Sequence, residues 1–305
     1  MKFGRIYFKT TNENKLFFPD EGITKGEILN YYRNIAGLMV PYLKDRPLTM
    51  LRHPDGITGE SFFQKQASHY FPGWIKKVRI KKEGGTVNHV VCNNAPTLVY
   101  LANQACLTPH IWLSKTDKIN YPDRMIFDLD PSDDDFNKVK QTARHLLNFL
   151  TQELKLNVFL MTTGSRGIHL IVPLFRNRSF DEVRSFAQNA AKVIAQKYPE
   201  LITTEIRKEK RGSRVFIDTA RNAYAQTAVA PFAVRAINGA PVAAPFDYNE
   251  LSDKDFNPRQ YNIKNIFQKI GSGPNPWENM GRKKNSLNKA EKLLEKSLEI
   301  SEEIW

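Results

Sequence analysis

Cysteine is scarce in this chain of 305 residues, and long apolar runs are missing. The two cysteines, Cys92 and Cys106, stand apart in apolar surroundings, which excludes a disulfide framework and leaves too few ligands for a zinc site. We therefore expect both thiols in the core. No stretch approaches the roughly eighteen apolar residues of a membrane helix, and no apolar signal core follows Met1. These absences predict a cytoplasmic protein without a membrane partner.

Negative charge is in short supply relative to positive charge. The sequence has 45 Lys and Arg against 32 Asp and Glu, which gives a formal net charge of +13. Basic residues gather at 76–82 and again at 207–214. A protein of this charge is expected to bind a polyanion, with nucleic acid ahead of an anionic membrane surface; the alternative is a generally basic surface.

Hydrophobic periodicity and capping residues predict an α+β protein. Thr24 and Glu27 form a capping box before a helix over 24–43, and Ser179 caps another helix that runs to Lys197. The remaining expected elements are a helix over 96–106, a strand over 124–130, a helix over 134–153, and strands over 158–162, 168–173 and 214–218. From 124 onward the order strand, helix, strand, strand, helix, strand resembles a split βαβ layout. We expect one globular unit over 1–270, a loop or linker over 271–285 and an amphipathic helix over 286–305.

Asp128 and Asp130 are the first candidate site residues. Side chains at i and i+2 of a strand share a face, so the two carboxylates are expected side by side. Such a pair favours a divalent cation between its members, although a solvated strand end has the same pattern. Asp218 ends a second apolar strand and would complete a two-metal site, or it starts a plain turn.

Three further patterns have both a functional and a structural interpretation. The turn over 162–169 combines hydroxyls, glycines, Arg166 and His169, which suits a triphosphate but also an ordinary hairpin. Neither a Walker A motif nor GxGxxG occurs, so a P-loop ATPase or a Rossmann enzyme is disfavoured. His110 beside a tryptophan suits a core residue as well as a site. The pair Phe62-Phe63 suits base stacking in a basic groove or core packing.

Taken together, these motifs resemble the polymerase domain of bacterial ligase D, a member of the archaeo-eukaryotic primase superfamily. The likeness covers about 12 to 251, and no KxDG ligase motif accompanies it. It is carried in order by Arg46-Pro47-Leu48-Thr49, Arg52-His53-Pro54-Asp55-Gly56, Phe62-Phe63-Gln64-Lys65, Thr97-Leu98-Val99-Tyr100-Leu101-Ala102-Asn103, His110-Ile111-Trp112, Asp123-Arg124-Met125-Ile126-Phe127-Asp128-Leu129-Asp130-Pro131, Gly167-Ile168-His169, Arg211-Gly212-Ser213-Arg214-Val215-Phe216-Ile217-Asp218, Arg221-Asn222, Val229-Ala230-Pro231, Val234-Arg235-Ala236 and Ala240-Pro241-Val242.

The resemblance also implies roles for single residues. It implies a catalytic metal-binding triad of Asp128, Asp130 and Asp218, with His110 at the catalytic centre. It implies nucleotide binding by Thr163, Arg166, His169, Arg211 and Gln226. It implies DNA binding by Asn12, Lys15, Lys25, Arg52, Phe62, Phe63 and Arg235, the first three around the 5′-phosphate of a break. Thr163 and Arg166 replace the usual serine and lysine and keep hydroxyl and charge. Gln226 replaces a usual lysine and loses a cation.

The implied fold is a primase-polymerase fold, with an RRM-like palm packed against a second α/β module. The implied activity is template-dependent primer extension that fills short gaps, favours ribonucleotides and uses two Mn²⁺ or Mg²⁺ ions. The implied partners are DNA ends with a 5′-phosphate, NTP or dNTP substrates, a Ku-like protein and an ATP-dependent ligase in the bacterial cytosol or nucleoid. The alternatives are a de novo primase and a catalytically silent DNA-end-binding module.

Overall fold

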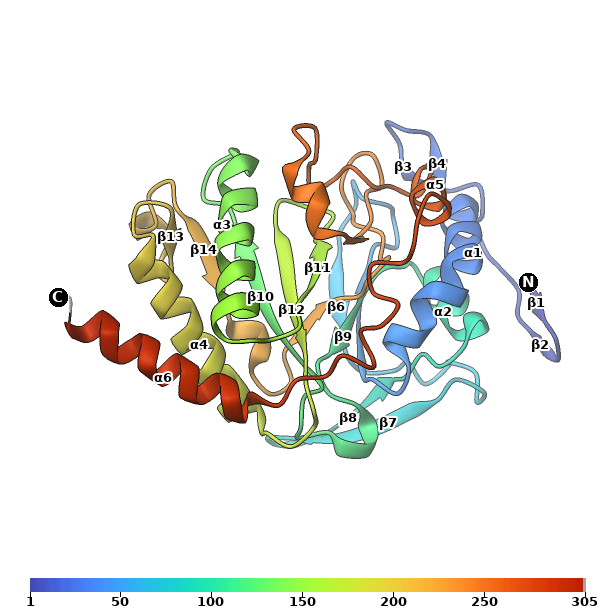
Figure 1. The fold of residues 1–305 in the computed structure, drawn as a ribbon. Coiled ribbons are helices and arrows are strands. Elements are labelled where there is room, and N and C mark those ends of the chain that lie inside the picture. Colours follow the sequence, from blue (N-terminus) through green and yellow to red (C-terminus); the bar gives the residue numbers. More distant parts are fainter. Residues whose placement is uncertain (304–305) are drawn as a thin grey trace. The chain divides into compact units, whose positions relative to one another are not determined.

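A computed structural model describes residues 1–303, with side chains described as far as residue 299. Helices and sheets are mixed along the chain (Figure 1). The chain forms two compact units, each assembled from separate segments. Unit 1 comprises 1–117, 227–244 and 261–269; unit 2 comprises 118–226, 245–260 and 270–305.

A six-stranded sheet organises unit 2. Its strand order is β13-β14-β10-β12-β11-β16, and every pair is antiparallel except β13 with β14. The strands are β10 (Arg124–Asp130), β11 (Phe159–Thr162), β12 (Ile168–Pro173), β13 (Ile202–Thr203), β14 (Val215–Asp218) and β16 (Pro245–Phe246). The strands expected over 124–130 and 168–173 are confirmed at both ends.

Two helices pack against this sheet, α3 (Phe136–Asn148) and α4 (Phe180–Lys197), as Figure 1 shows. The predicted capping box of α4 is present: Ser179 Oγ accepts from the backbone N–H of Glu182, whose carboxylate accepts from the N–H of Ser179. The helix expected over 134–153 begins at Phe136, after Asp135 as N-cap. It continues to Glu153 only through a π-helical turn, η2 (Phe149–Glu153).

Unit 1 contains a four-stranded sheet of order β15-β9-β5-β6. Its strands are β5 (Leu48–Arg52), β6 (Phe62–Gln64), β9 (Cys106–Trp112) and β15 (Thr227–Val229). The predicted helix over 24–43 is confirmed as α1 (Lys25–Leu43), with Thr24 as N-cap and Glu27 completing the capping box.

The prediction of a helix over 96–106 is wrong at its end. The helix, α2 (Ala95–Asn103), stops at Asn103, and Ala105 takes the left-handed backbone conformation with φ of 60°. The chain then reverses, and Cys106 opens β9 opposite Arg52. The apolar residues up to Cys106 fit either element, so composition did not locate this boundary.

The remaining helices and strands complete the described part of the chain. The strands are β1 (Lys2–Phe3), β2 (Ile6–Tyr7), β3 (Leu16–Phe18), β4 (Ile23–Thr24), β7 (Lys77–Lys82) and β8 (Gly85–Val90). The helices are η1 (Thr116–Lys118), η3 (Lys208–Lys210), η4 (Ala220–Asn222), η5 (Tyr248–Ser252), α5 (Ile266–Gly271) and α6 (Leu287–Glu303). Residues 304 and 305 of the helix expected over 286–305 lie outside the described residues. No helix among the described residues has the length and apolar character needed to cross a membrane.

Both cysteines lie in the core of unit 1, as predicted. Cys92 and Cys106 are free thiols that are almost fully buried. Burial raises the pKa of each thiol to about 12, which keeps both protonated at neutral pH.

The segment over 272–285 is fastened to unit 2 at two points. The buried indole of Trp277 donates to the Leu160 carbonyl at 2.9 Å. The Asn285 amide donates to the carbonyls of Pro173 at 2.8 Å and Asn157 at 3.0 Å. These bonds hold the chain against the ends of two strands before α6 begins.

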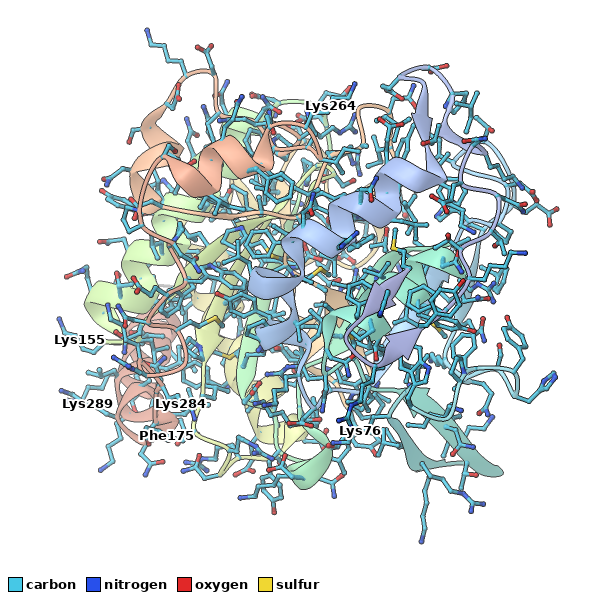
Figure 2. The ribbon with its side chains drawn as sticks, turned by 90° about the vertical axis from the view of Figure 1, so that its right-hand side faces the viewer. Lys76, Lys155, Phe175, Lys264, Lys284 and Lys289 are labelled. Carbon is cyan, nitrogen blue, oxygen red and sulfur yellow. The ribbon has the colours of Figure 1, made fainter. Side chains whose placement is uncertain are left out.

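Positive charge in unit 2 extends beyond the two sequence clusters. Figure 2 shows the side chains of Lys155, Lys284 and Lys289 on its surface, and all three are exposed. They come from the turn after η2, the segment before α6, and α6 itself. The net charge is therefore spread over several elements rather than confined to 207–214.

Candidate active site

Three carboxylates meet at the junction of β10 and β14. Asp128 pairs directly with Asp218 across the antiparallel ladder, and Asp130 lies two residues further along the same face of β10. One carboxylate oxygen from each of the three lies within 4.8 Å of the others. The residues that the sequence singled out therefore converge, although Asp218 follows Asp128 by 90 positions in the chain.

The surroundings of the three acids differ. Burial opposes ionisation of Asp128, but His169 Nε2 lies 3.2 Å from its Oδ1 and Arg221 Nε lies 3.5 Å from its Oδ2. These two groups hold the pKa of Asp128 below its ordinary value. Burial, together with the negative charges of Asp128 and Asp218, raises the pKa of Asp130 to about 6. One position of the cluster therefore carries an unfavourable charge at neutral pH.

A divalent cation would remove this conflict. Three oxygen ligands of full or partial negative charge suit Mg²⁺ or Mn²⁺. Burial and the charges of Asp128 and Asp218, which raise the pKa of Asp130, are the unfavourable terms that a bound cation would offset. The residues thus fit a divalent metal centre.

The turn between β11 and β12 lies against the triad strand. The hydroxyl of Thr163 accepts from the backbone N–H groups of Ser165 at 3.3 Å and Gly167 at 3.2 Å, so this side chain shapes the turn. Arg166 at the tip is exposed. A Cβ added to Gly167 would stand 2.1 Å from the Leu129 carbonyl oxygen, between the two aspartates of β10. Only glycine allows the turn to approach this closely.

Arg211 and Gln226 stand apart from the turn. The Arg211 guanidinium donates to the carbonyls of Glu205 at 2.8 Å and Ile206 at 2.7 Å, and it lies 3.8 Å over the Phe216 ring. These contacts fix the basic loop onto β14 at Phe216, which pairs directly with Asp130 of the triad. Gln226 is exposed beyond η4.

Two residues that the motif included without a role prove to matter for the geometry. Arg221 supplies the ion pair to Asp128 described above. Asn222 is fully buried and binds both backbone groups of Ile126: its Oδ1 accepts from the N–H at 2.8 Å, and its Nδ2 donates to the carbonyl at 2.7 Å. The amide thus extends the pairing of β10 past the end of β14. The amide side chain directly after Arg221 was the only sequence signal for this bridge.

We expect Asn222→Ala to lower the free energy of unfolding by about 1–3 kcal/mol, because it leaves two buried backbone groups of Ile126 without a partner. Urea unfolding followed by far-UV circular dichroism measures this. Asn189→Ala, on the exposed side of α4, is the matched control and should change stability by less than about 0.5 kcal/mol. Equal effects of the two substitutions would contradict the bridge.

In unit 1, aromatic and basic candidates gather on β5, β6 and β9. Phe62 and Phe63 are both exposed, and the Arg52 guanidinium lies 5.4 Å from the Phe62 ring. The ring of His110 meets Phe63 edge-on at 5.5 Å. The core alternative for the phenylalanine pair is therefore wrong, since both rings reach solvent. His110 is half-buried in β9 between Thr49 and Val229.

Lys25 begins α1, whereas Asn12 and Lys15 lie before β3, and the Lys15 carbonyl accepts from the backbone N–H of Lys25 at 2.8 Å. The buried ammonium of Lys25 donates to the Thr11 carbonyl at 2.7 Å and to its hydroxyl at 3.2 Å. Asn12 is left-handed, with φ of 53°, and Lys15 forms an ion pair with Asp55. Arg235 lies elsewhere in unit 1, where its backbone N–H donates to the Pro241 carbonyl at 2.7 Å.

The chain is similar to one family throughout most of its length. The model of the LigD primase-polymerase domain matches residues 24–277. The multifunctional non-homologous end joining protein LigD of Mycolicibacterium smegmatis is 33% identical over 249 residues, which are 81% of this chain and 33% of that protein. The bifunctional LigD of Bacillus subtilis is 30% identical over 262 residues, 85% of this chain and 42% of the relative. The chain thus spans less than half the length of these relatives.

The fold agrees with a solved structure of the same kind. The polymerase domain from Mycobacterium tuberculosis ligase D, solved in complex with DNA, has a TM-score of 0.85 at 27% identity and covers 92% of this chain and 99% of that one. This match confirms the predicted α+β fold class. The family model, the relatives and the fold agree with the acidic triad, and we conclude that the chain belongs to the LigD primase-polymerase domain family.

Proposed function

We propose that this protein extends a primer 3′ end by copying a DNA template at a broken end, filling short gaps and favouring ribonucleotides. The observation that carries the proposal is the meeting of Asp128, Asp130 and Asp218 within 4.8 Å at the junction of β10 and β14. In such a cluster, Mn²⁺ or Mg²⁺ would make the primer 3′-hydroxyl more acidic and neutralise charge at the α-phosphate. A silent DNA-end-binding module would gain nothing from three carboxylates held together at this cost.

The protein's own residues would position the reactants. His169 and Arg221 keep Asp128 ionised and therefore ready to hold a cation. The turn over 163–167 presents Arg166 at the end of β10, where it would bind the phosphates of an incoming nucleotide. Phe62 and Phe63 present exposed rings beside Arg52, which suits stacking on template bases and contact with the sugar-phosphate backbone.

The cellular setting is part of the same proposal. The relatives carry names of non-homologous end joining, and the solved neighbour is a complex with DNA. We place this protein at DNA ends in the bacterial cytosol, where a Ku-like protein would hold the ends and an ATP-dependent ligase would seal the product.

The test is a gapped duplex with a 5′-phosphate on the downstream strand, offered with ribo- or deoxynucleotides and with Mg²⁺ or Mn²⁺. We expect extension to the end of the gap, templated by the opposite strand, with a higher kcat/KM for the ribonucleotide. Absence of extension under every combination would contradict the polymerase assignment. Chains started without a primer would favour the primase alternative.

Lys25 is proposed to recognise the 5′-phosphate. Lys25 is a buried residue at the N-terminus of α1, a helix of 19 residues whose dipole favours an anion at this end. Burial, followed by the positive charge of Lys15, lowers the pKa of Lys25 to about 8. A bound phosphate would offset the cost of this desolvation, because it places a negative charge next to the ammonium.

Lys25→Ala is expected to weaken binding to a 5′-phosphorylated recessed end by about ten- to a hundredfold, since a charge-assisted hydrogen bond of roughly 1.5–3 kcal/mol is lost. Binding to a 5′-hydroxyl end should change by less than about twofold. Fluorescence anisotropy at fixed ionic strength measures both. Lys44→Ala, at the exposed opposite end of α1, removes the same charge and should affect both ends alike. Equal losses in the Lys25 variant would refute this role.

The same lysine gives a pH dependence of defined sign. Lys25 is charged below its pKa of about 8 and neutral above it. The preference for phosphorylated ends should therefore be strong near pH 7 and decline as the pH rises toward about 9, with a midpoint at or above 8 because the bound phosphate stabilises the ammonium. A preference that increases over this range would contradict the assignment. The Lys25→Ala variant should lack the decline.

A further inference from the structure

A pocket of about 320 Å³ opens in unit 2 at the carboxyl end of β10. Its lining includes Pro131, Asp133, Asp134, Ser165, Arg166 and Arg259. These residues come from three separate segments: the chain between β10 and α3, the turn between β11 and β12, and the loop after η5. The last of these segments bore no functional motif in the sequence.

The pocket is adjacent to the acidic triad. Pro131, one of its walls, directly follows Asp130. The opposite wall is the turn that carries Ser165 and Arg166, and Gly167 of this turn lies against the Leu129 carbonyl. A nucleotide whose α-phosphate lies at the triad would therefore have a pocket available for its distal phosphates at the end of the same strand.

The charges lining the pocket favour an anion. Arg166 and Arg259 are both exposed and both reach it. Of the two aspartates in the lining, Asp133 forms an ion pair of 2.5 Å with Lys138, which compensates its charge. Asp134 alone then opposes two guanidinium groups.

Arg259 is also oriented for this role. Its Nε donates to the Ser165 carbonyl at 2.9 Å, which ties the loop after η5 to the turn. A guanidinium is planar, and the bond uses one edge of its fork while its Nη atoms carry further N–H donors. Such a bond fixes the plane of the group in advance, and a fixed fork binds phosphate oxygens with little further loss of entropy.

We propose that Arg259, together with Arg166, binds the terminal phosphate of the incoming nucleoside triphosphate. This inference rests on the proposed polymerase function. It also accounts for Gln226, which stands where the family resemblance implies a lysine near the triphosphate. Arg259 supplies a cation to the same ligand from a different segment of the chain, so the negative charge of the triphosphate is still compensated.

The experiment compares wild type, Arg259→Ala and Arg259→Lys in the full chain. Equilibrium binding of a non-hydrolysable ribonucleoside triphosphate and of the matching monophosphate is measured by calorimetry, and KM and kcat by gap filling. We expect Arg259→Ala to weaken triphosphate binding by about tenfold or more and to raise KM similarly, with kcat and monophosphate binding within about twofold. Arg259→Lys should recover part of the loss. Lys254→Ala, an exposed cation in the same loop, should change nothing.

Several results would overturn the inference. The first is unchanged triphosphate affinity in Arg259→Ala, and the second is an equal loss of affinity for triphosphate and monophosphate. The third is a loss of affinity for gapped DNA alone, which would assign the pocket to a DNA phosphate. Additive losses in Arg166→Ala/Arg259→Ala would also count against a shared phosphate, because two groups on one ligand should be coupled. The binding measurements do not require turnover, so they test Arg259 even if wild type extends no primer and the polymerase function itself fails.

Discussion

Asp130→Asn is expected to lower the rate of primer extension by about a thousandfold or more. The amide keeps the shape of the side chain but gives up an anionic oxygen of the triad. A metal centre contributes several kcal/mol to the stabilisation of the transition state, and about 1.4 kcal/mol corresponds to each factor of ten. Single-turnover extension of a gapped duplex with saturating nucleotide and Mn²⁺ measures the loss. Asp255→Asn, an exposed aspartate of unit 2, is the matched control and should retain full activity.

The same substitution should stabilise the protein when metal is removed. In the folded state the pKa of Asp130 is raised to about 6 from 3.8, so the carboxyl binds its proton more tightly than in the unfolded chain. Its contribution to stability is therefore greatest below pH 3.8 and is lost as the pH rises through about 6. At neutral pH an uncharged amide avoids that cost, on the order of 1–2 kcal/mol for a half-buried group.

Two thermal melts distinguish relief of the unfavourable charge from general destabilisation by the substitution. In chelator at about pH 7.5, Asp130→Asn should melt above wild type, by several degrees for a stability gain of this size. With Mn²⁺ added, wild type should gain stability and the variant should gain much less, because its cluster binds the cation less tightly. A variant that melts below wild type in chelator would contradict the conclusion that burial and the neighbouring carboxylates make the charged form of Asp130 unfavourable.

Local features of the sequence predicted the elements that carry the site. The capping boxes at Thr24 and Ser179 located two helix starts, because a cap depends on residues three positions apart. The strand over 124–130 placed Asp128 and Asp130 on one face, because side chains alternate along any strand. No local feature indicates that β14 pairs with β10 in the register that brings Asp218 opposite Asp128. The family resemblance supplied that expectation.

The features missed by sequence reasoning depend on contacts between distant segments. Asn222 reads as a turn residue until its amide is seen to bind Ile126, and Arg259 reads as one more surface cation until its bond to Ser165 is known. Arg211 shows the opposite case. The resemblance assigns it to the nucleotide, whereas its guanidinium binds carbonyls of its own loop, so its role as a phosphate ligand remains a prediction.

Gly167→Ala is expected to lower both stability and activity, because the added methyl group would meet the Leu129 carbonyl oxygen at 2.1 Å. That oxygen belongs to the backbone of β10, so no side-chain rotation can relieve the contact. Strands β10 and β12 must separate, and Leu129 sits between the two aspartates of the triad. We expect a loss of about 3 kcal/mol in the free energy of unfolding, at the upper end for an overpacked methyl group. Denaturant unfolding measures it.

The loss of primer-extension activity should be larger than the loss of folding stability alone would cause. At a temperature where the Gly167→Ala variant is still folded, primer extension should drop by about a hundredfold, since a displacement on the order of 1 Å at a reacting centre has that effect. The matched control is Gly37→Ala on the exposed side of α1, where an added Cβ meets no atom within 4 Å. Alanine there should stabilise the helix by roughly 0.5–1 kcal/mol and leave extension unchanged. If Gly167→Ala folds and extends primers like wild type, then the close approach of turn and strand does not set the spacing of Asp128 and Asp130, and the β11–β12 turn has no part in positioning the triad.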